Sequence, residues 1–325
     1  TGKEYLTDDM TAQAVNFINK RATIKDEPFF LYFCHFAVHT PLQGREKDIE
    51  HFENKESKGW NNHVSPVYAS MVKSLDESVG NIMESLKKNR LENNTLVVFM
   101  SDNGGISTKI AHQGTYTDNS PFLGGKANVT EGGIRVPLIF WWKNNLKGGQ
   151  WSDIPVDCSD ILPTFADIAG YNVDEIIKTN DLDGRSFASL LSDVGNLEKG
   201  YKKNIRYWYY PFNVIYNSPF DGLPLQPHSA IRDGDYKLIF DWYGRIFLFD
   251  IKKDPFEKNN LVKKKPELSN YLFDKLMCWT KKNVKNTYKP YLNKDYHANL
   301  EERDVPFINL VKAWQKNKNI AELAN

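Results

Sequence analysis

Short apolar runs that follow helix-patterned segments restrict the fold of this chain more than any other feature. Residues 29–33, 95–100 and 136–141 are nearly all apolar and have the length of strands. Residues 71–86 place an apolar side chain every three or four positions, which is the spacing of one helix face. Uninterrupted apolar strands among amphipathic helices are typical of a parallel sheet with both faces covered. The sequence therefore predicts an α/β fold with a mainly parallel sheet flanked by helices.

The pattern changes beyond about Asn196. The turn sequences Asp233-Gly234-Asp235 and Tyr243-Gly244 separate short apolar runs and are typical of hairpins. The strands and helix expected in this part are at residues 229–231, 236–242, 246–249 and 268–278. We therefore divide the chain into an α/β part, residues 1–195, and a smaller α+β part with an antiparallel sheet, residues 196–325.

Composition excludes two classes of partner. Lys and Arg number 42 against 41 Asp and Glu, so the formal net charge is +1. Nucleic-acid binders normally carry a strong basic excess, and we expect no nucleic-acid partner. The apolar runs are far shorter than the ~20 residues that span a bilayer, and we expect no membrane partner. The three cysteines are too few and too scattered for a disulfide framework, and they leave the redox compartment undecided.

An acidic motif, Ser101-Asp102-Asn103-Gly104-Gly105, directly follows the second apolar run. Ligands of open α/β sheets gather beyond the carboxyl ends of the strands. Asp102 and Asn103 present a carboxylate and an amide oxygen side by side, and Ca²⁺ or Mg²⁺ prefers such oxygen ligands. The alternative is a simple turn in which Asp and Asn bond to the local backbone. The motif alone leaves both interpretations open.

A histidine stands just beyond the first apolar run, in Ala37-Val38-His39-Thr40-Pro41. At a sheet edge His39 could act as a general acid, an oxyanion donor or a metal ligand. It could equally close the turn before Pro41. His35 alternates with the expected strand and is predicted to be a packed core residue. Cys34 beside it is predicted to be a buried thiol.

A glycine-bounded lysine forms the third cluster, Gly124-Gly125-Lys126, which residues 130–137 follow closely. This cluster is not a P-loop, because Ser120 and Ala127 stand where that motif needs Gly and Ser or Thr. A lysine on such a loop still suits a tetrahedral oxyanion as a compact charge. An exposed lysine on a flexible loop is the alternative.

Taken together, these motifs resemble the C-terminal part of the type I sulfatases, in the alkaline-phosphatase-like superfamily. Six segments match in the correct order: residues 28–32 with 39–41, 68–76, 101–105, 125–137, 160–164 and 230–238. Each segment alone is a weak signal, whereas six in order are specific. The resemblance implies an alkaline-phosphatase-like fold and hydrolysis of sulfate esters, on a sulfated glycan or polysaccharide.

The resemblance also assigns roles to individual residues. It implies that Asp102 and Asn103 bind Ca²⁺, which neutralises the charge of the sulfate and acts as a Lewis acid. It implies that His39 contacts the sulfate and protonates or stabilises the leaving oxygen, and that Lys126 holds a sulfate oxygen and stabilises the transition state. Further candidates for substrate contact are His112, His228 and Arg232.

One departure from the family is large. Sulfatases make a formylglycine nucleophile from Cys or Ser in a Cys/Ser-x-Pro/Ala-x-Arg motif, and no Cys or Ser of residues 1–325 begins that pattern. We therefore expect the nucleophile, the first acidic calcium pair and a second Lys/His pair to lie in an N-terminal segment of the same enzyme, upstream of Thr1. That segment would be a partner of this chain, which we expect to be inactive alone.

Two other functions stay open at this point. One is a metal-dependent phosphodiesterase or phosphatase of the same superfamily, and the other is a carbohydrate-binding fragment without catalysis. The aromatic residues 207–210 could line a sugar subsite or belong to the core. The resemblance implies a periplasmic or secreted location.

Overall fold

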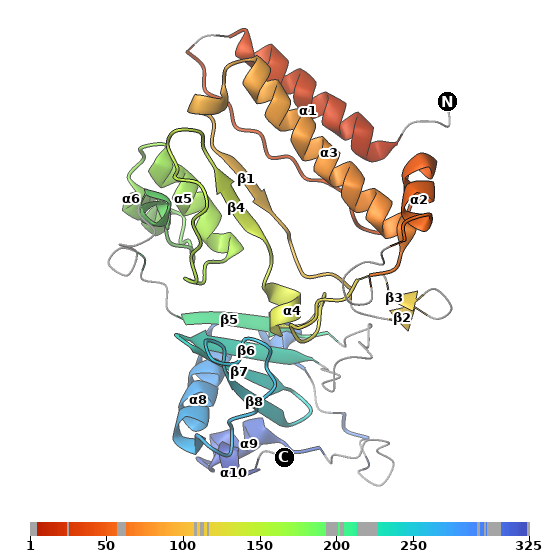
Figure 1. Ribbon diagram of the computed structural model, residues 1–325. Coiled ribbons are helices and arrows are strands. Elements are labelled where there is room, and N and C mark those ends of the chain that lie inside the picture. Colours follow the sequence, from red (N-terminus) through yellow and green to blue (C-terminus); the bar gives the residue numbers. More distant parts are fainter. Residues whose placement is uncertain are drawn as a thin grey trace. The chain divides into compact units, whose positions relative to one another are not determined.

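The structure of the chain is a computed structural model (Figure 1). It describes residues 5–24, 26–56, 63–106, 109–110, 114–115, 117–192, 201, 205–212, 227–290, 293–295, 297 and 307–323. The chain divides into two compact units, residues 1–100, 111–116 and 137–201 in the first, and residues 101–110, 117–136 and 202–325 in the second. The motif-bearing loops thus fold with the C-terminal part. The division at 195/196 stays a prediction.

Three helices of the first unit are α1 (Leu6–Ala22), α2 (Glu46–Glu53) and α3 (Pro66–Lys88). α1 and α3 lie side by side (Figure 1). Small side chains occupy much of the buried face of α3, at Ser70, Ser74, Ser78 and Ser85. Small residues let helix backbones approach closely, and Thr11 Oγ1 on α1 donates a hydrogen bond of 2.6 Å to Ser78 Oγ. The helix at residues 71–86 is confirmed, but serines share its contact face.

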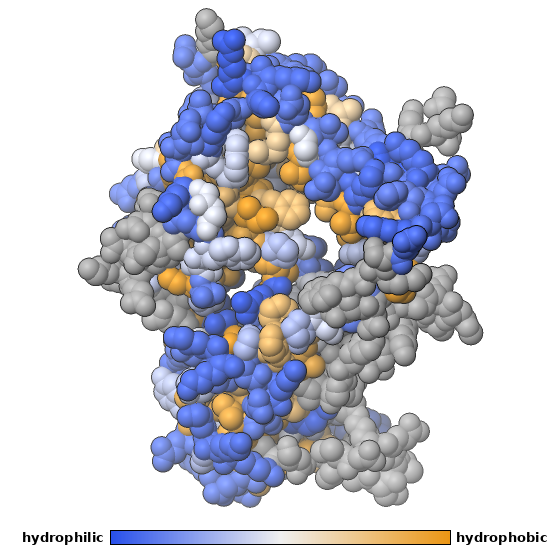
Figure 2. Space-filling model, in the orientation of Figure 1, coloured by the Kyte–Doolittle hydropathy of each residue, from blue (hydrophilic) through white to orange (hydrophobic). Residues whose placement is uncertain are grey.

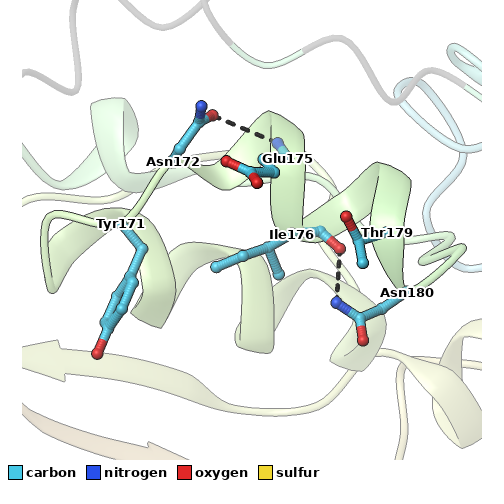
Figure 3. Close-up of a pocket in the computed structure, with 6 residues that line it drawn as sticks. All are labelled: Tyr171, Asn172, Glu175, Ile176, Thr179 and Asn180. Carbon is cyan, nitrogen blue, oxygen red and sulfur yellow. Dashed lines mark hydrogen bonds between the residues drawn. The ribbon is translucent and has the colours of Figure 1, made fainter.

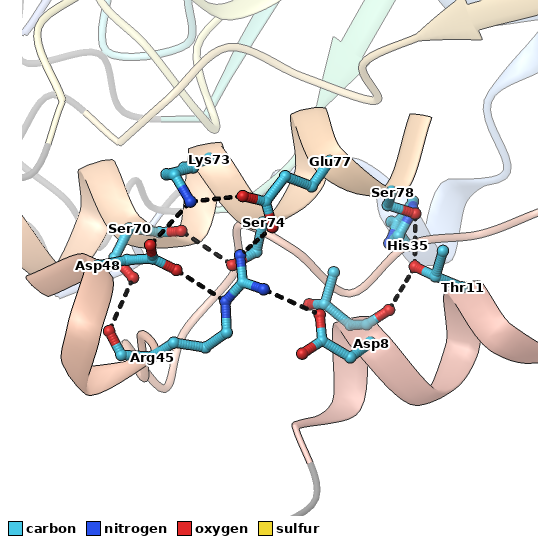
Figure 4. Close-up of polar contacts among 11 residues, drawn as sticks. Asp8, Thr11, His35, Arg45, Asp48, Ser70, Lys73, Ser74, Glu77 and Ser78 are labelled. Atoms are coloured by element: carbon cyan, nitrogen blue, oxygen red, sulfur yellow. Dashed lines mark hydrogen bonds and ion pairs between the residues drawn. The ribbon is translucent and has the colours of Figure 1, made fainter. Parts of the chain in front are cut away.

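An ionic network joins α2 to α3 (Figure 4). The Asp48 carboxylate, nearly buried, lies 2.8 Å from both Arg45 Nε and Lys73 Nζ. Glu77 pairs with the same two cations. Because each carboxylate meets both cations, the short helix α2 is held in one orientation on α3.

Residues 28–36 are extended but belong to no strand within the described part of the chain. The prediction of a buried strand at residues 29–33 was therefore wrong about pairing and burial. Alternate side chains point outward, and the large exposed ones are Phe30, Tyr32 and Phe36 at 72, 80 and 68% exposure. An apolar run sets an extended backbone, but it cannot supply a neighbouring strand to bond with.

The other side of this extended segment packs on the helices. The ring of Phe29 meets that of Phe17 edge to face at 5.7 Å, and His35 Nε2 lies 3.0 Å from Ser78 Oγ. His35 is half buried, in keeping with its predicted packing role. Cys34 is exposed rather than buried, because the alternation of the segment turns it outward.

Strands β1 (Val97–Met100) and β4 (Leu138–Trp141) pair antiparallel, with Val97 opposite Trp141. The parallel pairing expected here does not occur among the described strands of this unit. Met100 and Ile139 are 41 and 56% exposed, and Figure 2 shows apolar side chains at the surface over the part of the first unit that holds these strands. Periodicity indicates a strand but not its neighbour or direction.

Short elements complete the first unit. They are η1 (Glu92–Asn94), β3 (Gly114–Thr115), η2 (Cys158–Asp160), α5 (Ile161–Ile168), α6 (Val173–Thr179) and α7 (Ala188–Ser192). Phe187, Leu190 and Tyr201 form a small core against the partly buried Leu138 and Phe140 of β4. This core anchors the inner face of β4.

The second unit is built on a four-stranded antiparallel sheet in the order β5-β6-β7-β8. Its strands are β5 (Ile205–Tyr210), β6 (His228–Asp233), β7 (Tyr236–Asp241) and β8 (Arg245–Asp250). The predicted antiparallel sheet is thereby confirmed. Gly234 and Gly244 take φ values of 58° and 100° in the hairpin turns, a conformation that glycine adopts without strain.

The other elements of this unit are β2 (Lys109–Ile110), α4 (Glu131–Ile134), α8 (Pro266–Asn283), η4 (Asn286–Tyr288), α9 (Leu310–Gln315) and α10 (Ile320–Leu323). The main core lies between the sheet and α8, where the Phe273 ring meets Phe240 at 5.0 Å. None of the described helices is long and apolar enough to cross a membrane.

Much of the aromatic stretch 207–210 serves packing. The Tyr207 ring stacks on Trp279 of α8 at 4.8 Å, and Trp208 packs against the core beneath the other face. Tyr209 donates its hydroxyl to the carbonyl oxygen of Tyr288, and burial raises the pKa of Tyr209 to about 12. These contacts favour the core interpretation of the stretch over the sugar-subsite interpretation.

We expect Phe273→Ala to destabilise the second unit by about 3–5 kcal/mol, because it removes a fully buried ring from the main core. The matched change Phe212→Ala removes a ring that is 63% exposed and should cost less than about 1 kcal/mol. Urea unfolding of both variants measures the difference. Equal costs would contradict this description of the core.

We expect acidification from pH 7.5 to 5.5 to weaken the first unit through His35. Burial lowers the pKa of His35, so the unfolded chain takes up a proton first as the pH falls below about 6.5. The stability that depends on neutral His35 is complete above that pH and is lost below it. Urea unfolding of wild type and His35→Gln at both pH values should show a smaller loss in the variant, and parallel losses would refute the assignment.

Candidate active site

The acidic motif and the lysine motif fold into one compact structure of the second unit. The amide of Gly104 donates to the carbonyl oxygen of Gly133 at 2.9 Å, and the amide of Lys126 donates to that of Gly105 at 3.0 Å. The amide of Gly132 in turn donates to the carbonyl oxygen of Leu123 at 2.8 Å. Backbone bonds therefore join residues 101–105, the lysine loop (residues 122–130) and α4.

The glycines of these motifs are required by close backbone contact. A Cβ atom on Gly104 would lie 1.8 Å from the carbonyl oxygen of Gly132. A Cβ atom on Gly132 would lie 2.3 Å from the carbonyl oxygen of Gly124, and one on Gly133 would lie 2.2 Å from that of Asn128. No other residue type fits at such distances without a shift of the backbone. We call this set of contacts the glycine junction, defined by Gly104, Gly124, Gly132 and Gly133.

Asn119 adds a side-chain clamp that the sequence analysis missed. Its Nδ2 donates to the carbonyl oxygens of Gly105 and Gly124, at 2.8 and 3.1 Å, and its Oδ1 accepts from the amide of Gly105 at 3.1 Å. One amide group thus bonds to both motif-bearing loops. An Asn before Ser120-Pro121 has the pattern of an ordinary turn, and so no sequence signal marked it.

Asp102 and Asn103 can supply part of a calcium shell. Asp102 is exposed and Asn103 half buried. Asn103 Nδ2 donates to the carbonyl oxygen of Gly104 at 2.9 Å, so Oδ1 is the atom that suits a cation. A carboxylate and an amide oxygen fit the chemistry of Ca²⁺, but Ca²⁺ takes 6–8 oxygen ligands. No group of three His, Cys, Asp or Glu suited to a metal occurs in the part of the chain that the structure describes.

Lys126 is half buried between two left-handed residues, Gly124 at φ 75° and Ala127 at φ 71°. His39 belongs to the first unit and is exposed, with Nδ1 3.0 Å from the carbonyl oxygen of Thr40. The hydroxyl oxygen of Thr40 lies 3.3 Å from the same nitrogen, so both ring contacts of Nδ1 are to the neighbouring residue. The structure thus places Asp102, Asn103 and Lys126 in one unit and His39 in the other.

The further candidates differ in accessibility. His228 is fully buried in β6, with its ring 5.2 Å from that of Tyr210, and offers no surface to a substrate in this structure. Arg232 is half buried and donates from Nε to the carbonyl oxygen of Gly234 at 3.1 Å, and burial lowers its pKa. His112 lies outside the described residues.

A surface pocket lies in the first unit, around α6 (Figure 3). Its lining residues are Tyr171, Asn172, Glu175, Ile176, Thr179 and Asn180. Asn172 and Asn180 are engaged in bonds to the backbone of α6, as a cap and in its last turn. None of the predicted site residues lines this pocket, and it supplies no evident chemistry.

Comparison with known families decides the identity of the motifs. The family model described as Sulfatase matches residues 1–171, slightly more than half of the chain. This chain belongs to the sulfatase family. A second model, described as N-sulphoglucosamine sulphohydrolase, C-terminal, matches residues 125–282. The suspected resemblance to type I sulfatases is thereby confirmed along most of the sequence.

Individual sulfatases agree with the family match. The chain is 30% identical over 316 residues to a sulfatase of Formosa agariphila, covering 90% of this chain and 54% of that protein. It is 33% identical over 274 residues to the steryl-sulfatase of Homo sapiens, covering 79% of this chain and 44% of that protein. The chain thus spans about half the length of the curated relatives it matches.

A solved structure confirms the fold class. The crystal structure of Ps i-CgsB superimposes with a TM-score of 0.69 at 32% identity, covering 85% of this chain and 55% of that one. The alkaline-phosphatase-like sulfatase fold, with its C-terminal antiparallel sheet, is therefore the fold of this chain. The same protein has been crystallised with k-i-k-neocarrahexaose.

We expect Gly104→Ala to destabilise the second unit by about 1–3 kcal/mol, because the new Cβ atom collides with the carbonyl oxygen of Gly132. Gly80→Ala is the matched control. Nothing lies within 4 Å of a Cβ atom at Gly80, and alanine favours a helix interior by about 1 kcal/mol. Urea unfolding should show opposite signs for the two variants, and a neutral Gly104→Ala would contradict the glycine junction.

Proposed function

We propose that this chain carries part of the active site of an enzyme that hydrolyses sulfate esters on a sulfated glycan or polysaccharide. The observation that carries the proposal is the glycine junction, which ties the loop of Asp102 and Asn103 to that of Lys126. Oxygen ligands for a cation and a lysine for an oxyanion then belong to one rigid structure. Membership of the sulfatase family supports the reaction class.

Each residue has a distinct role in the proposed reaction. Lys126 holds a sulfate oxygen and stabilises the charge that develops in the transition state. His39 gives a proton to the leaving oxygen, or stabilises it. Asp102 and Asn103 would hold Ca²⁺, which supplies charge neutralisation and Lewis acidity when bound.

The nucleophile of the proposed reaction comes from outside the printed sequence. No Cys/Ser-x-Pro/Ala-x-Arg motif occurs in residues 1–325, and a formylglycine therefore has no source within them. The proposal requires a further segment of the same enzyme as partner, and residues 1–325 alone should not turn over a sulfate ester. A periplasmic or secreted location belongs to the same proposal.

The glycan substrate class rests on relatives. A structural neighbour is crystallised with a carrageenan-type oligosaccharide, and N-acetylgalactosamine-6-sulfatase of Homo sapiens is 33% identical over 170 residues. The relation to a steryl-sulfatase makes a sulfated steroid the competing substrate. Sulfate release from a sulfated oligosaccharide and from a steroid sulfate, measured side by side, distinguishes the two classes.

We expect Lys126→Ala to lower sulfate release by the full-length natural enzyme about 10²–10³-fold, because it removes a charge that stabilises the transition state. The measurement is the initial rate of sulfate release from a sulfated oligosaccharide. Lys147→Ala removes an exposed lysine outside the proposed site and should leave that rate unchanged. Full activity of Lys126→Ala, or a faster reaction with a phosphodiester than with any sulfate ester, would overturn the proposal.

A further inference from the structure

A buried lysine lies in the core of the second unit. Lys237 is on β7, and its side chain has no exposed surface. Its Nζ lies 2.7 Å from Glu131 Oε1, 2.6 Å from Glu257 Oε1 and 3.0 Å from the carbonyl oxygen of Val129. Nζ donates hydrogen bonds to Glu131 and to the carbonyl oxygen of Val129, and it forms an ion pair with Glu257. Lysine is almost never fully buried unless it is paired, so this arrangement calls for an explanation.

The charges around Lys237 balance. Glu131 and Glu257 are also buried, at 3 and 0% side-chain exposure, and Glu257 Oε2 accepts from the amide of Glu131 at 2.7 Å. Arg135 Nη1 lies 3.7 Å from Glu131 Oε2 and brings a second cation. Burial raises the pKa of Glu257, whereas the charge of Lys237 opposes that rise. Two acids and two bases thus form one neutral group, the Lys237 cluster.

The cluster holds the segment that carries Lys126. Val129, Glu131 and Arg135 follow Lys126 within nine residues, whereas Lys237 and Glu257 come from β7 and the loop after β8. Lys237 therefore joins the end of the lysine loop to the C-terminal sheet through bonds at a position with no exposed surface, where charged bonds are strong.

An aromatic contact holds the start of the same loop. The Phe122 ring lies 5.6 Å from that of Phe256, next to Glu257, and the guanidinium of Arg135 lies 5.0 Å above the Phe122 ring. Both ends of the lysine loop are thus anchored to the strand and loop that bear Lys237 and Glu257. The backbone bonds of the glycine junction extend this anchoring to residues 101–105.

We propose that Lys237 is a positioning residue for the anion-binding loop of Lys126. It touches no substrate, and it acts by fixing Val129 and Glu131, and through them the glycine junction. This inference rests on the proposed function for the identity of the anion. A buried ionic group of this kind is often no more stabilising than apolar packing, so its value lies in fixing one geometry.

The test introduces Lys237→Met into residues 1–325 and makes two measurements. Hydrogen exchange reports the protection of the amides of Lys126 and Gly132, and titration with inorganic sulfate reports anion affinity. Lys237→Met should speed exchange of these amides at least about tenfold and weaken sulfate binding about tenfold, while β8 and α8 keep their protection. Lys275→Met is the control, because Lys275 lies in the same unit and pairs with Asp233 of β6 rather than with the lysine loop.

Two results would overturn the inference. One is unchanged exchange of the loop amides, and the other is an equal loss of protection in the loop, β8 and α8, which a merely structural lysine would produce. Should Lys237→Met fail to fold, Glu257→Gln decides by the same criteria, since it leaves Glu131 to pair with Lys237. Absence of sulfate binding by the wild-type chain would count against the proposed function, while the exchange data would still decide the role of Lys237.

Discussion

The close backbone contact among four glycines is the constraint on which the candidate site depends. Gly104 lies against the carbonyl oxygen of Gly132, and Gly132 lies against that of Gly124. A side chain at either position would separate the acidic loop from the lysine loop. Because steric repulsion rises steeply at such distances, the contact has a single geometry. Asn119 bonds to both loops, and the Lys237 cluster holds the end of the lysine loop.

The two units differ in how far their apolar side chains are buried. The second unit buries a continuous core between its sheet and α8. The first unit holds α1, α2 and α3 together through serine contacts and ion pairs, while one side of its extended segment presents Phe30 and Tyr32 to solvent. An apolar side chain stabilises a fold only when its surface is removed from water. The local sequence of residues 28–36 therefore sets the alternating exposure of their side chains. It does not supply a second strand for this segment to pair with.

Several features could be predicted from residue patterns alone. The helix at residues 71–86, the strands expected at 95–100 and 136–141 and the hairpins around Gly234 and Gly244 all followed from local periodicity and turn chemistry, and the structure has strands within both ranges. Burial of single polar residues was harder to predict. Lys237 stands in a strand where a lysine would ordinarily be a solvated position, and its two carboxylate partners lie over a hundred and twenty positions apart along the sequence. No local pattern reports such a partnership.

The family follows from the amino-acid sequence alone, because the order and spacing of its motifs are specific even where each motif is weak. The sequence also shows which chemical groups are available: a carboxylate and an amide at Asp102 and Asn103, an ammonium at Lys126 and an imidazole at His39. The fold was needed to show which of these groups share one compact unit, that His228 is buried and that Lys237 faces Glu131. Motifs depend on neighbours along the chain, whereas burial and ion pairing depend on neighbours in space.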